Sequence, residues 1–182
     1  MPRDKLEKMA EGYLEQITDK IEEVQDERDL WEAGMYFTIA VMMQERDLPK
    51  EALKDINKAL KLSPDDPDYY YTKAEILLEL EKPKEALRSL HRCIELEDEE
   101  YDEEDVPQNP SSFMLKADVY HDLGKYKIAI DYNLKAIQMF KKQKIIKDPR
   151  QETLADAVYS VGHHYLHLKK YKESLKWLQK AE

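Results

Sequence analysis

Residues 67–100 read PDYYYTKAEILLELEKPKEALRSLHRCIELEDEE and contain three small residues, Ala74, Ala86 and Cys93, separated by steps of 12 and 7. The same two steps occur in three further sets, and the four sets start 34, 43 and 45 residues apart. The other sets are Ala40, Ala52 and Ala59; Ala117, Ala129 and Ala136; and Gly162, Ser174 and Ala181. Two helices approach closely only where no large side chain intervenes. The spacing therefore predicts a repeated pair of packed helices.

Each twelve-residue step contains a signal that ends a helix. Pro49, Pro83 and Gly124 mark the first three steps, and the charged pair Lys169-Lys170 marks the fourth. Proline cannot continue a helix, and glycine adopts the left-handed conformation that often terminates one. Each unit is thus predicted to be a helix, a tight turn and a second helix. The helices are expected near residues 29–46, 50–62, 67–80, 84–97, 110–123, 127–143, 151–168 and 172–182.

A 34-residue helical hairpin with small residues at these places resembles the tetratricopeptide repeat, over about residues 33–182. The family's aromatic positions are matched by Tyr36, Tyr70, Phe113, Tyr120 and Tyr165, and its terminal proline by Pro64. The pattern departs at Lys73 and Lys116, where leucine is frequent, and at Asn133, which replaces an aromatic residue.

The resemblance implies an all-α fold, a right-handed α-solenoid of about four hairpins. The units would lie near residues 33–66, 67–100, 110–143 and 155–182, with inserts at 101–109 and 144–154. An ordinary helical bundle with coincidentally aligned alanines is the alternative.

Residues 1–28 do not follow the period, but their apolar residues recur every three or four positions, as in an amphipathic helix. These residues are Leu6, Ala10, Tyr13, Ile17, Ile21 and Val24. A terminal repeat exposes an apolar face, so this helix is expected to cap the first unit. The predicted division is a capping helix over 1–28 and a repeat domain over 29–182, and a dimerising or partner-binding helix is the alternative.

The resemblance also implies that the first helix of each unit lines a concave groove that binds a peptide or helix of a partner. The groove residues carried over are Phe37, Val41, Glu45, Tyr71, Glu75, Glu79, Met114, Asp118, His121, Asp122, Tyr159, His163 and His167. Because this set is aromatic and acidic, it favours a partner segment with basic and apolar side chains. It lacks the basic clamp with which some family members hold a C-terminal carboxylate.

Composition excludes several classes of partner and location. A formal net charge of -10 argues against nucleic acid and anionic lipid as main partners. No apolar run approaches the length of a membrane span, and no secretory signal is visible, so a cytoplasmic protein is predicted. The single cysteine, Cys93, excludes an internal disulfide and is expected to be a buried, inert thiol.

The two inserts differ in charge. Residues 97–105 are almost entirely acidic but lack the glycine of a calcium loop, so a solvated loop is predicted, with docking of a basic partner as the alternative. The second insert is basic, and the two could attract each other within one molecule or between neighbours.

Three histidines cluster as His163-His164-x-x-His167. His163 and His167 share a helix face, as paired zinc ligands would, and His121 with Asp118 and Asp122 could complete a site from the adjacent hairpin. His164 stands where a zinc protease would carry glutamate, so hydrogen-bonded or solvated histidines are expected, and no metal or cofactor.

No nucleophile, phosphate-binding loop or acid–base motif is apparent, so the sequence predicts a non-enzymatic scaffold for protein interactions. Two alternatives stay open: a self-assembling structural protein that forms homo-oligomers, and a regulatory segment of a longer protein. Neither the partner nor its pathway follows from the sequence.

Overall fold

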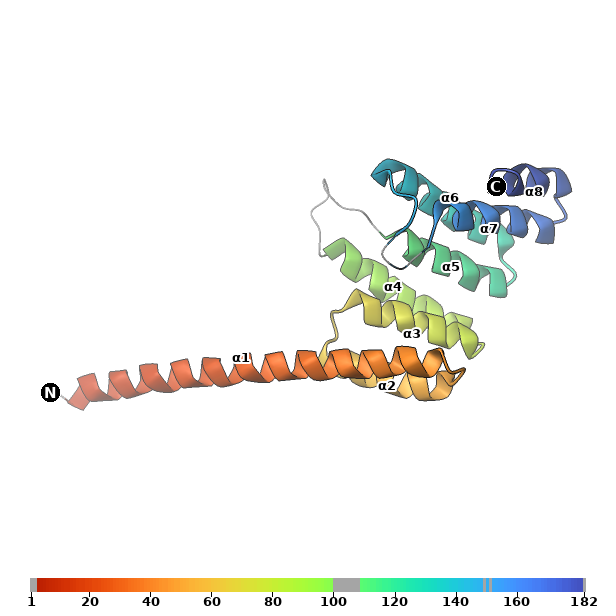
Figure 1. Ribbon diagram of the computed structural model, residues 1–182. Helices are drawn as coiled ribbons and strands as arrows, with labels where there is room; N and C mark the ends of the chain where they lie inside the picture. Colours follow the sequence, from red (N-terminus) through yellow and green to blue (C-terminus); the bar gives the residue numbers. More distant parts are fainter. Residues whose placement is uncertain (1–2, 100–108, 149, 151, 182) are drawn as a thin grey trace.

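The computed structural model describes residues 3–99, 109–148, 150 and 152–181, with side chains described from residue 12 onward, except those of 98 and 99. Every regular element in these ranges is an α-helix, which confirms the all-α prediction. The helices are α1 (Arg3–Gln44), α2 (Pro49–Leu62), α3 (Pro67–Glu79), α4 (Pro83–Glu99), α5 (Pro110–Asp122), α6 (Tyr126–Gln143), α7 (Leu154–His167) and α8 (Tyr171–Leu178). They form the hairpins α1/α2, α3/α4, α5/α6 and α7/α8 (Figure 1).

The hairpins stack in chain order. The second helix of each hairpin contacts the first helix of the next, as α2 contacts α3, α4 contacts α5 and α6 contacts α7. First helices also contact one another: α1 touches α3, and α3 touches α5. The aromatic rings of Phe37 in α1 and Tyr69 in α3 stack with their centroids 5.0 Å apart. We call the side formed by α1, α3, α5 and α7 the first-helix face.

The repeated small residues lie where the helices cross. The nine members of the first three sets have no exposed surface: Ala40, Ala52, Ala59, Ala74, Ala86, Cys93, Ala117, Ala129 and Ala136. In the last hairpin, a Cβ added to Gly162 would lie 2.8 Å from both Cγ and Cδ2 of Leu178 in α8. Close approach of helices at these positions confirms the prediction made from the 12- and 7-residue steps.

The turn inside each hairpin has one geometry. A single residue in each turn has a left-handed backbone, and the next amide donates a hydrogen bond to the carbonyl five residues earlier, as from Lys82 to Leu77 (2.8 Å) and from Lys125 to Tyr120 (2.8 Å). The four residues are Asp47, Glu81, Gly124 and Lys169, with φ angles of 60, 57, 69 and 57°. They repeat with the same spacing as the small residues.

Capping groups fix the beginnings of the later first helices. The Asp66 carboxylate accepts a hydrogen bond from the amide of Asp68, and the Asn109 side chain accepts one from the amide of Ser111. Thr153 and Asp156 form a reciprocal capping box at the start of α7.

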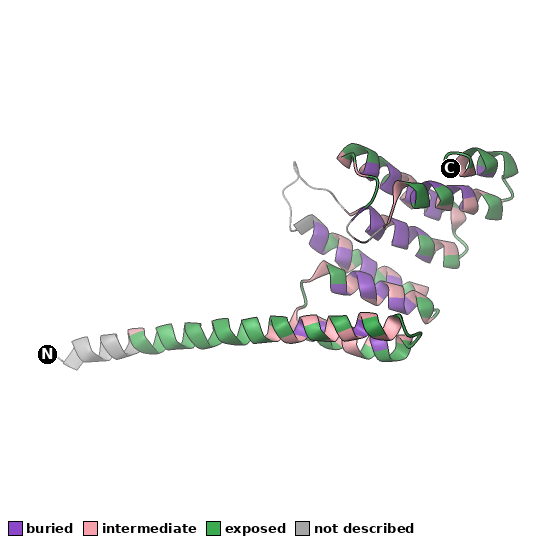
Figure 2. Ribbon diagram, in the orientation of Figure 1, coloured by how far each residue is buried: buried purple, intermediate pink, exposed green. Residues whose placement is uncertain are grey.

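The N-terminal segment differs from its prediction. Residues 1–28 were expected to cap the first hairpin, but the described part is continuous with α1 through residues 28 and 29 and projects away from the stack (Figure 1). Residues 13–28 of this projection are exposed (Figure 2). Its apolar residues between positions 12 and 28 thus contact no hairpin, because a straight extension of α1 carries them beyond the reach of α2 and α3.

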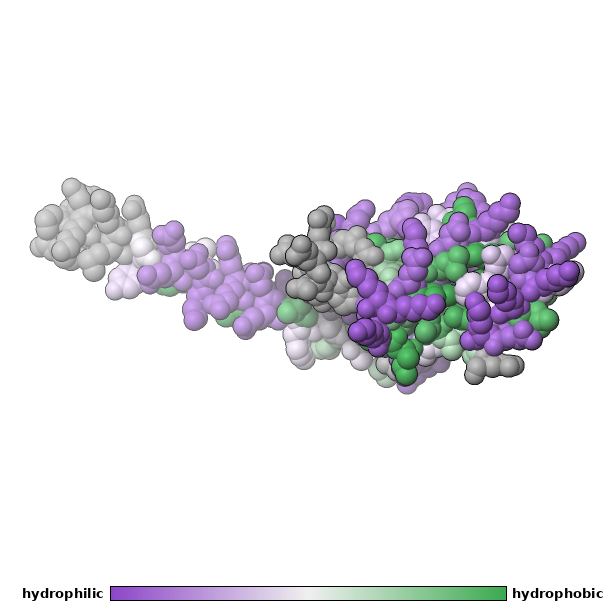
Figure 3. All heavy atoms as spheres, turned by 90° about the horizontal axis from the view of Figure 1, so that it is seen from above, coloured by the Kyte–Doolittle hydropathy of each residue, from purple (hydrophilic) through white to green (hydrophobic). Residues whose placement is uncertain are grey.

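Apolar side chains gather near the middle of the stack, among hydrophilic ones, when the molecule is viewed from its α6 and α8 side (Figure 3). The exposed large apolar residues of the last hairpin are Tyr159, Leu166, Tyr171 and Leu175.

Within the described ranges, no helix combines the length and the apolar character needed to cross a membrane.

Candidate functional site

The residues predicted to line the groove lie in the first helices, except Glu45, which follows α1. Six are exposed: Glu45, Glu79, Asp118, Asp122, Tyr159 and His167. Five are partly exposed: Phe37, Val41, Glu75, His121 and His163. Tyr71 and Met114 are buried, so they contribute to the floor of the first-helix face rather than to its open surface.

Tyr71 is covered by a residue from the second insert. The guanidinium carbon of Arg150 lies 4.1 Å from the centroid of the Tyr71 ring. Its Nη2 atom is 2.6 Å from Oδ1 of Asp68 at the start of α3, and its Nη1 atom is 2.8 Å from Oε1 of Glu97 in α4. Nη1 also donates a hydrogen bond to Oγ of Ser112 in α5 (2.8 Å). One side chain therefore connects α3, α4 and α5.

The rest of the α6–α7 connection is fixed by its own hydrogen bonds. The Asp148 carboxylate accepts hydrogen bonds from the amide (3.0 Å) and the hydroxyl of Ser111 at the start of α5. It also accepts one from the amide of Glu152 (3.0 Å), while the amide of Asp148 donates to the carbonyl of Glu152 (2.9 Å). This closed loop holds Arg150 over the junction of α3 and α5.

The ion pair between Arg150 and Glu97 joins the second insert to the first residue of the acidic run. Burial raises the pKa of the Glu97 carboxyl, and the adjacent guanidinium acts in the opposite direction. Residues 100–108, which contain most of that run, lie outside the described residues. The predictions for the run, a solvated loop or docking of a basic partner, therefore stay predictions. Cys93 is buried beside this pair, and burial raises the pKa of its thiol to about 12, which leaves the thiol protonated at neutral pH.

Carboxylates near the loop have unusual acidities. Loss of hydration raises the pKa of Glu75 to about 7; Arg150 opposes this shift, whereas Glu152 and Glu79 add to it. Loss of hydration raises the pKa of Asp118 to about 7, and the negative charges of Glu152 and Asp122 add to the shift. The Asp118 side chain keeps contact with solvent, whereas Glu75 is less exposed, so Glu75 should contribute more to the pH dependence of stability.

Four histidines converge at the C-terminal ends of α5 and α7. The Nδ1 atoms of His121 in α5 and His164 in α7 are 3.0 Å apart. The rings of His121 and His163 stack with centroids 5.4 Å apart, and the His167 ring meets both edge-on at 4.7 Å. Ligand atoms of His121, His163 and His164 all lie within 4.8 Å of one another.

The most buried of these histidines is held by a residue of α6. The Nε2 atom of His164 lies 2.9 Å from Nδ2 of Asn133, which has no exposed surface. Burial lowers the pKa of His164 to about 4, with further lowering by His121, His163 and His167. Burial also lowers the pKa of His121, so both rings are neutral at pH 7.

Sequence reasoning missed two parts of this face. Arg150 was seen only as one charge of a basic insert, and no periodic signal connects it with Asp68. For His164, the sequence showed only that it stands where a zinc protease carries glutamate, and its burial was not predicted. A usable signal for its burial was Asn133, whose polar side chain occupies an aromatic position of the repeat and thus calls for a polar partner.

Comparison of sequences with protein families finds the tetratricopeptide repeat at residues 56–88 and again at residues 110–143. The second match spans the α5/α6 hairpin, and the first spans the second half of α2, all of α3 and the start of α4. The comparison with curated proteins found no match.

Solved structures resemble the fold. A crystal structure of MamA is 19% identical, with a TM-score of 0.63 over 82% of this chain and 75% of that one. The apo form of RapI is 18% identical, with a TM-score of 0.70 over 84% of this chain and 55% of RapI. BtubC from P. vanneervenii is 16% identical, with a TM-score of 0.68 over 82% of this chain and 61% of that protein. The two sequence matches identify tetratricopeptide repeats at residues 56–88 and 110–143, and the likeness to these solved structures shows that the chain shares their fold.

Proposed function

We propose that this chain is a non-enzymatic scaffold whose first-helix face binds a segment of a partner protein with basic and apolar side chains. The observation that carries the proposal is the position of Arg150. This face already holds one arginine, stacked on Tyr71 and paired with Asp68 and Glu97. An arginine or lysine of a partner would meet similar chemistry on the neighbouring surface.

That neighbouring surface lies along α5 and α7. It presents the carboxylates of Asp118 and Asp122 and the exposed ring of Tyr159. Glu75 and Glu152 lie near Arg150 and have raised pKa values, so a cationic side chain bound beside them would favour their ionised forms. Tyr159 supplies an aromatic anchor, and the carboxylates select cationic side chains. Since Arg150 covers Tyr71, we place the binding segment over α5 and α7.

A peptide selection tests this assignment. The tag-free protein is offered to a library of displayed linear peptides, and the affinity of a selected peptide is measured by calorimetry. Enrichment of peptides with Arg or Lys next to an apolar residue is expected, with weaker binding at higher ionic strength. The double variant Asp118→Asn/Tyr159→Ala should lose most of this binding, whereas Tyr171→Ala, which removes an equally exposed tyrosine from α8, should keep it. Equal affinity of both variants would place the binding site elsewhere.

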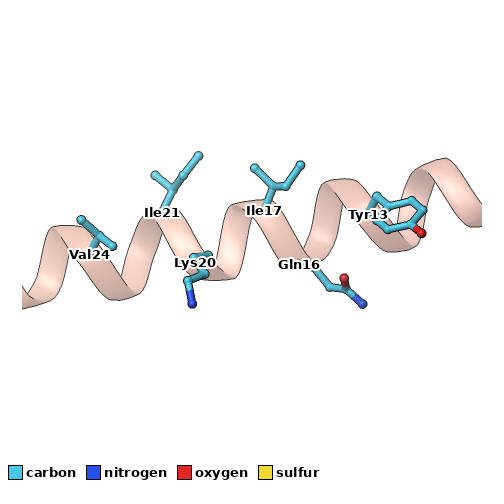
Figure 4. Close-up of a pocket in the computed structure, with 6 residues that line it drawn as sticks. All are labelled: Tyr13, Gln16, Ile17, Lys20, Ile21 and Val24. Carbon is cyan, nitrogen blue, oxygen red and sulfur yellow. The ribbon is translucent and has the colours of Figure 1, made fainter.

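A second candidate function, self-association, is favoured by the exposed projection of α1. Its apolar residues Tyr13, Ile17, Ile21 and Val24 follow steps of three and four and remain at least half exposed. Figure 4 shows Ile17 and Ile21 projecting to the same side of the helix, while Lys20 and Gln16 project to the other. We propose that this stripe pairs with the same stripe of a second copy.

Light scattering at increasing concentration distinguishes this candidate. A dimer that becomes a monomer in the double variant Ile17→Glu/Ile21→Glu, but not in Lys20→Gln, supports pairing through α1. A monomer at all concentrations would reject self-association and leave the partner-binding proposal untouched.

A further inference from the structure

We propose that His121, His163 and His164 form a binding site for a divalent transition-metal ion that joins α5 to α7. The three residues come from the first helices of adjacent hairpins. This inference does not depend on the proposed partner-binding function.

The distances suit a metal ion with nitrogen ligands. Two imidazole nitrogens bound to one zinc ion at tetrahedral angles lie about 3.3 Å apart, since each Zn–N bond is about 2.0–2.1 Å. The Nδ1 atoms of His121 and His164 are already 3.0 Å apart. A ring nitrogen of His163 lies within 4.8 Å of a ring nitrogen of each of these two residues. Because His163 is only partly buried, a change in its side-chain torsion can bring its nitrogen to the ion.

Asn133 supplies the supporting contact that metal-bound histidines need. A bound histidine usually donates its second N–H to an oxygen, which fixes the ring and its tautomer. The Asn133 amide lies 2.9 Å from Nε2 of His164, and its Oδ1 atom is buried without a hydrogen-bond partner. Exchanging the amide nitrogen and oxygen of Asn133 by half a turn of the amide group places Oδ1 where it can accept a hydrogen bond from Nε2–H of His164. His164 then offers the lone pair of Nδ1 to the ion.

The surroundings keep the ligands available. Neutral imidazole is the form that binds metal, and burial lowers the pKa of His121 and His164. His167 and Tyr126 pack around the His121 ring, and the Asp122 carboxylate acts to raise the pKa of His121. His167 or a water molecule from the first-helix face can complete four coordination positions. Imidazole ligands without thiolate suit Zn²⁺, Ni²⁺ and Cu²⁺, rather than Ca²⁺ or Mg²⁺.

The competing interpretation is a cluster of histidines that only hydrogen-bond and stack. In that case His121 and His164 share one proton through their 3.0 Å contact, and zinc binds at most weakly to exposed rings. The two interpretations differ in stoichiometry, in the spectrum of a cobalt complex and in the effect of Asn133.

The test is calorimetric titration of the metal-free, tag-free protein with ZnCl₂ at pH 7.5, and optical titration with CoCl₂. One equivalent of Zn²⁺ should bind with micromolar affinity or better, and Co²⁺ should give the visible absorption of a tetrahedral site with nitrogen ligands. His163→Ala should weaken binding at least about tenfold, while circular dichroism confirms the fold. His91→Gln is the matched control, because His91 is exposed on α4 and lies outside the cluster.

Asn133 provides a second, independent variant. Asn133→Asp keeps an oxygen acceptor beside His164 and should retain zinc affinity, whereas Asn133→Leu should weaken it about 10–100-fold. Absence of saturable binding to the unmodified protein would overturn the proposal. So would equal affinities in the unmodified protein and His163→Ala, since zinc would then bind elsewhere.

Discussion

Arg150→Ala removes the side chain that connects three helices of two hairpins. Its guanidinium pairs with Glu97 and Asp68, donates to Ser112 and covers the Tyr71 ring. The side chains of Arg150 and Glu97 are only 12% and 10% exposed, so this is an ion pair largely removed from water, whereas Asp68 is 64% exposed and adds little. The loss of one partner leaves the Glu97 carboxylate buried without a counter-charge.

The expected effect follows from that uncompensated charge. Removing one member of a buried ion pair reduces stability by about 3–5 kcal/mol, and the residual solvent contact of both groups places this pair near the lower end. One oxygen of Glu97 lacks a hydrogen-bond partner, and without Arg150 the other keeps only the uncharged donors of Ser112 and Cys93, which do not neutralise the carboxylate. Burial raises the pKa of Glu97 above that of an unfolded chain, and the loss of Arg150 raises it further. Stability of the variant should therefore fall as pH rises from the pKa of Glu97 in the unfolded chain to its higher pKa in the folded chain, and the deficit should be larger at pH 8 than at pH 5.

Urea unfolding followed by circular dichroism measures this difference at both pH values. The double variant Arg150→Ala/Glu97→Gln should recover about 1–2 kcal/mol at pH 8, because the amide removes the buried charge. A loss below about 1 kcal/mol in Arg150→Ala, or no recovery in the double variant, would refute the assignment of Arg150 as the group that neutralises Glu97.

Three further predictions concern the turns, the helix crossings and the groove. Gly124→Ala should lower stability by about 1 kcal/mol in urea unfolding, since φ is 69° and no atom lies within 4 Å of the new methyl group, so the effect is confined to the backbone. Gly162→Ala should lose about 1–2 kcal/mol instead through the contact with Leu178, and hydrogen exchange should become faster chiefly in α8. The stability of the unmodified protein should decrease between about pH 4.5 and 7, where the unfolded chain ionises Glu75 but the folded chain, with a pKa of about 7, does not. Glu75→Gln should remove part of that decrease in melting temperatures measured across the range.

The repeat period predicted the fold because it encodes contacts between neighbours in the chain. Small residues are needed at Ala74, Ala86 and Cys93 because the two helices of one hairpin approach closely there. All three residues are completely buried, as this reason requires. The α6–α7 connection lies outside the repeat period. The period therefore could not predict that Arg150 of this connection contacts α3. Arg150 and Asp68 are 82 positions apart, and only the stacked hairpins bring them together.

The histidine cluster was predicted in part for a similar reason. Helical spacing placed His163 and His167 on one face, and the hairpin repeat placed His121 on the neighbouring helix. The spacing could not show that His164 turns inward, because that depends on a polar partner from α6. The projection of α1 was missed because an amphipathic pattern specifies a face for burial but not the surface that covers it.

The specific chemistry of this chain is concentrated where it departs from its repeat. The insert between the third and fourth units supplies Arg150, and the replacement of an aromatic residue by Asn133 makes room for a polar partner to His164. Both departures place polar groups in buried positions, where each needs a partner from another helix. Such contacts tie α5 to its neighbours on either side, to α3 through Arg150 and to α7 through His164. The third unit is therefore the one in which a substitution should alter both the shape of the first-helix face and the groups displayed on it.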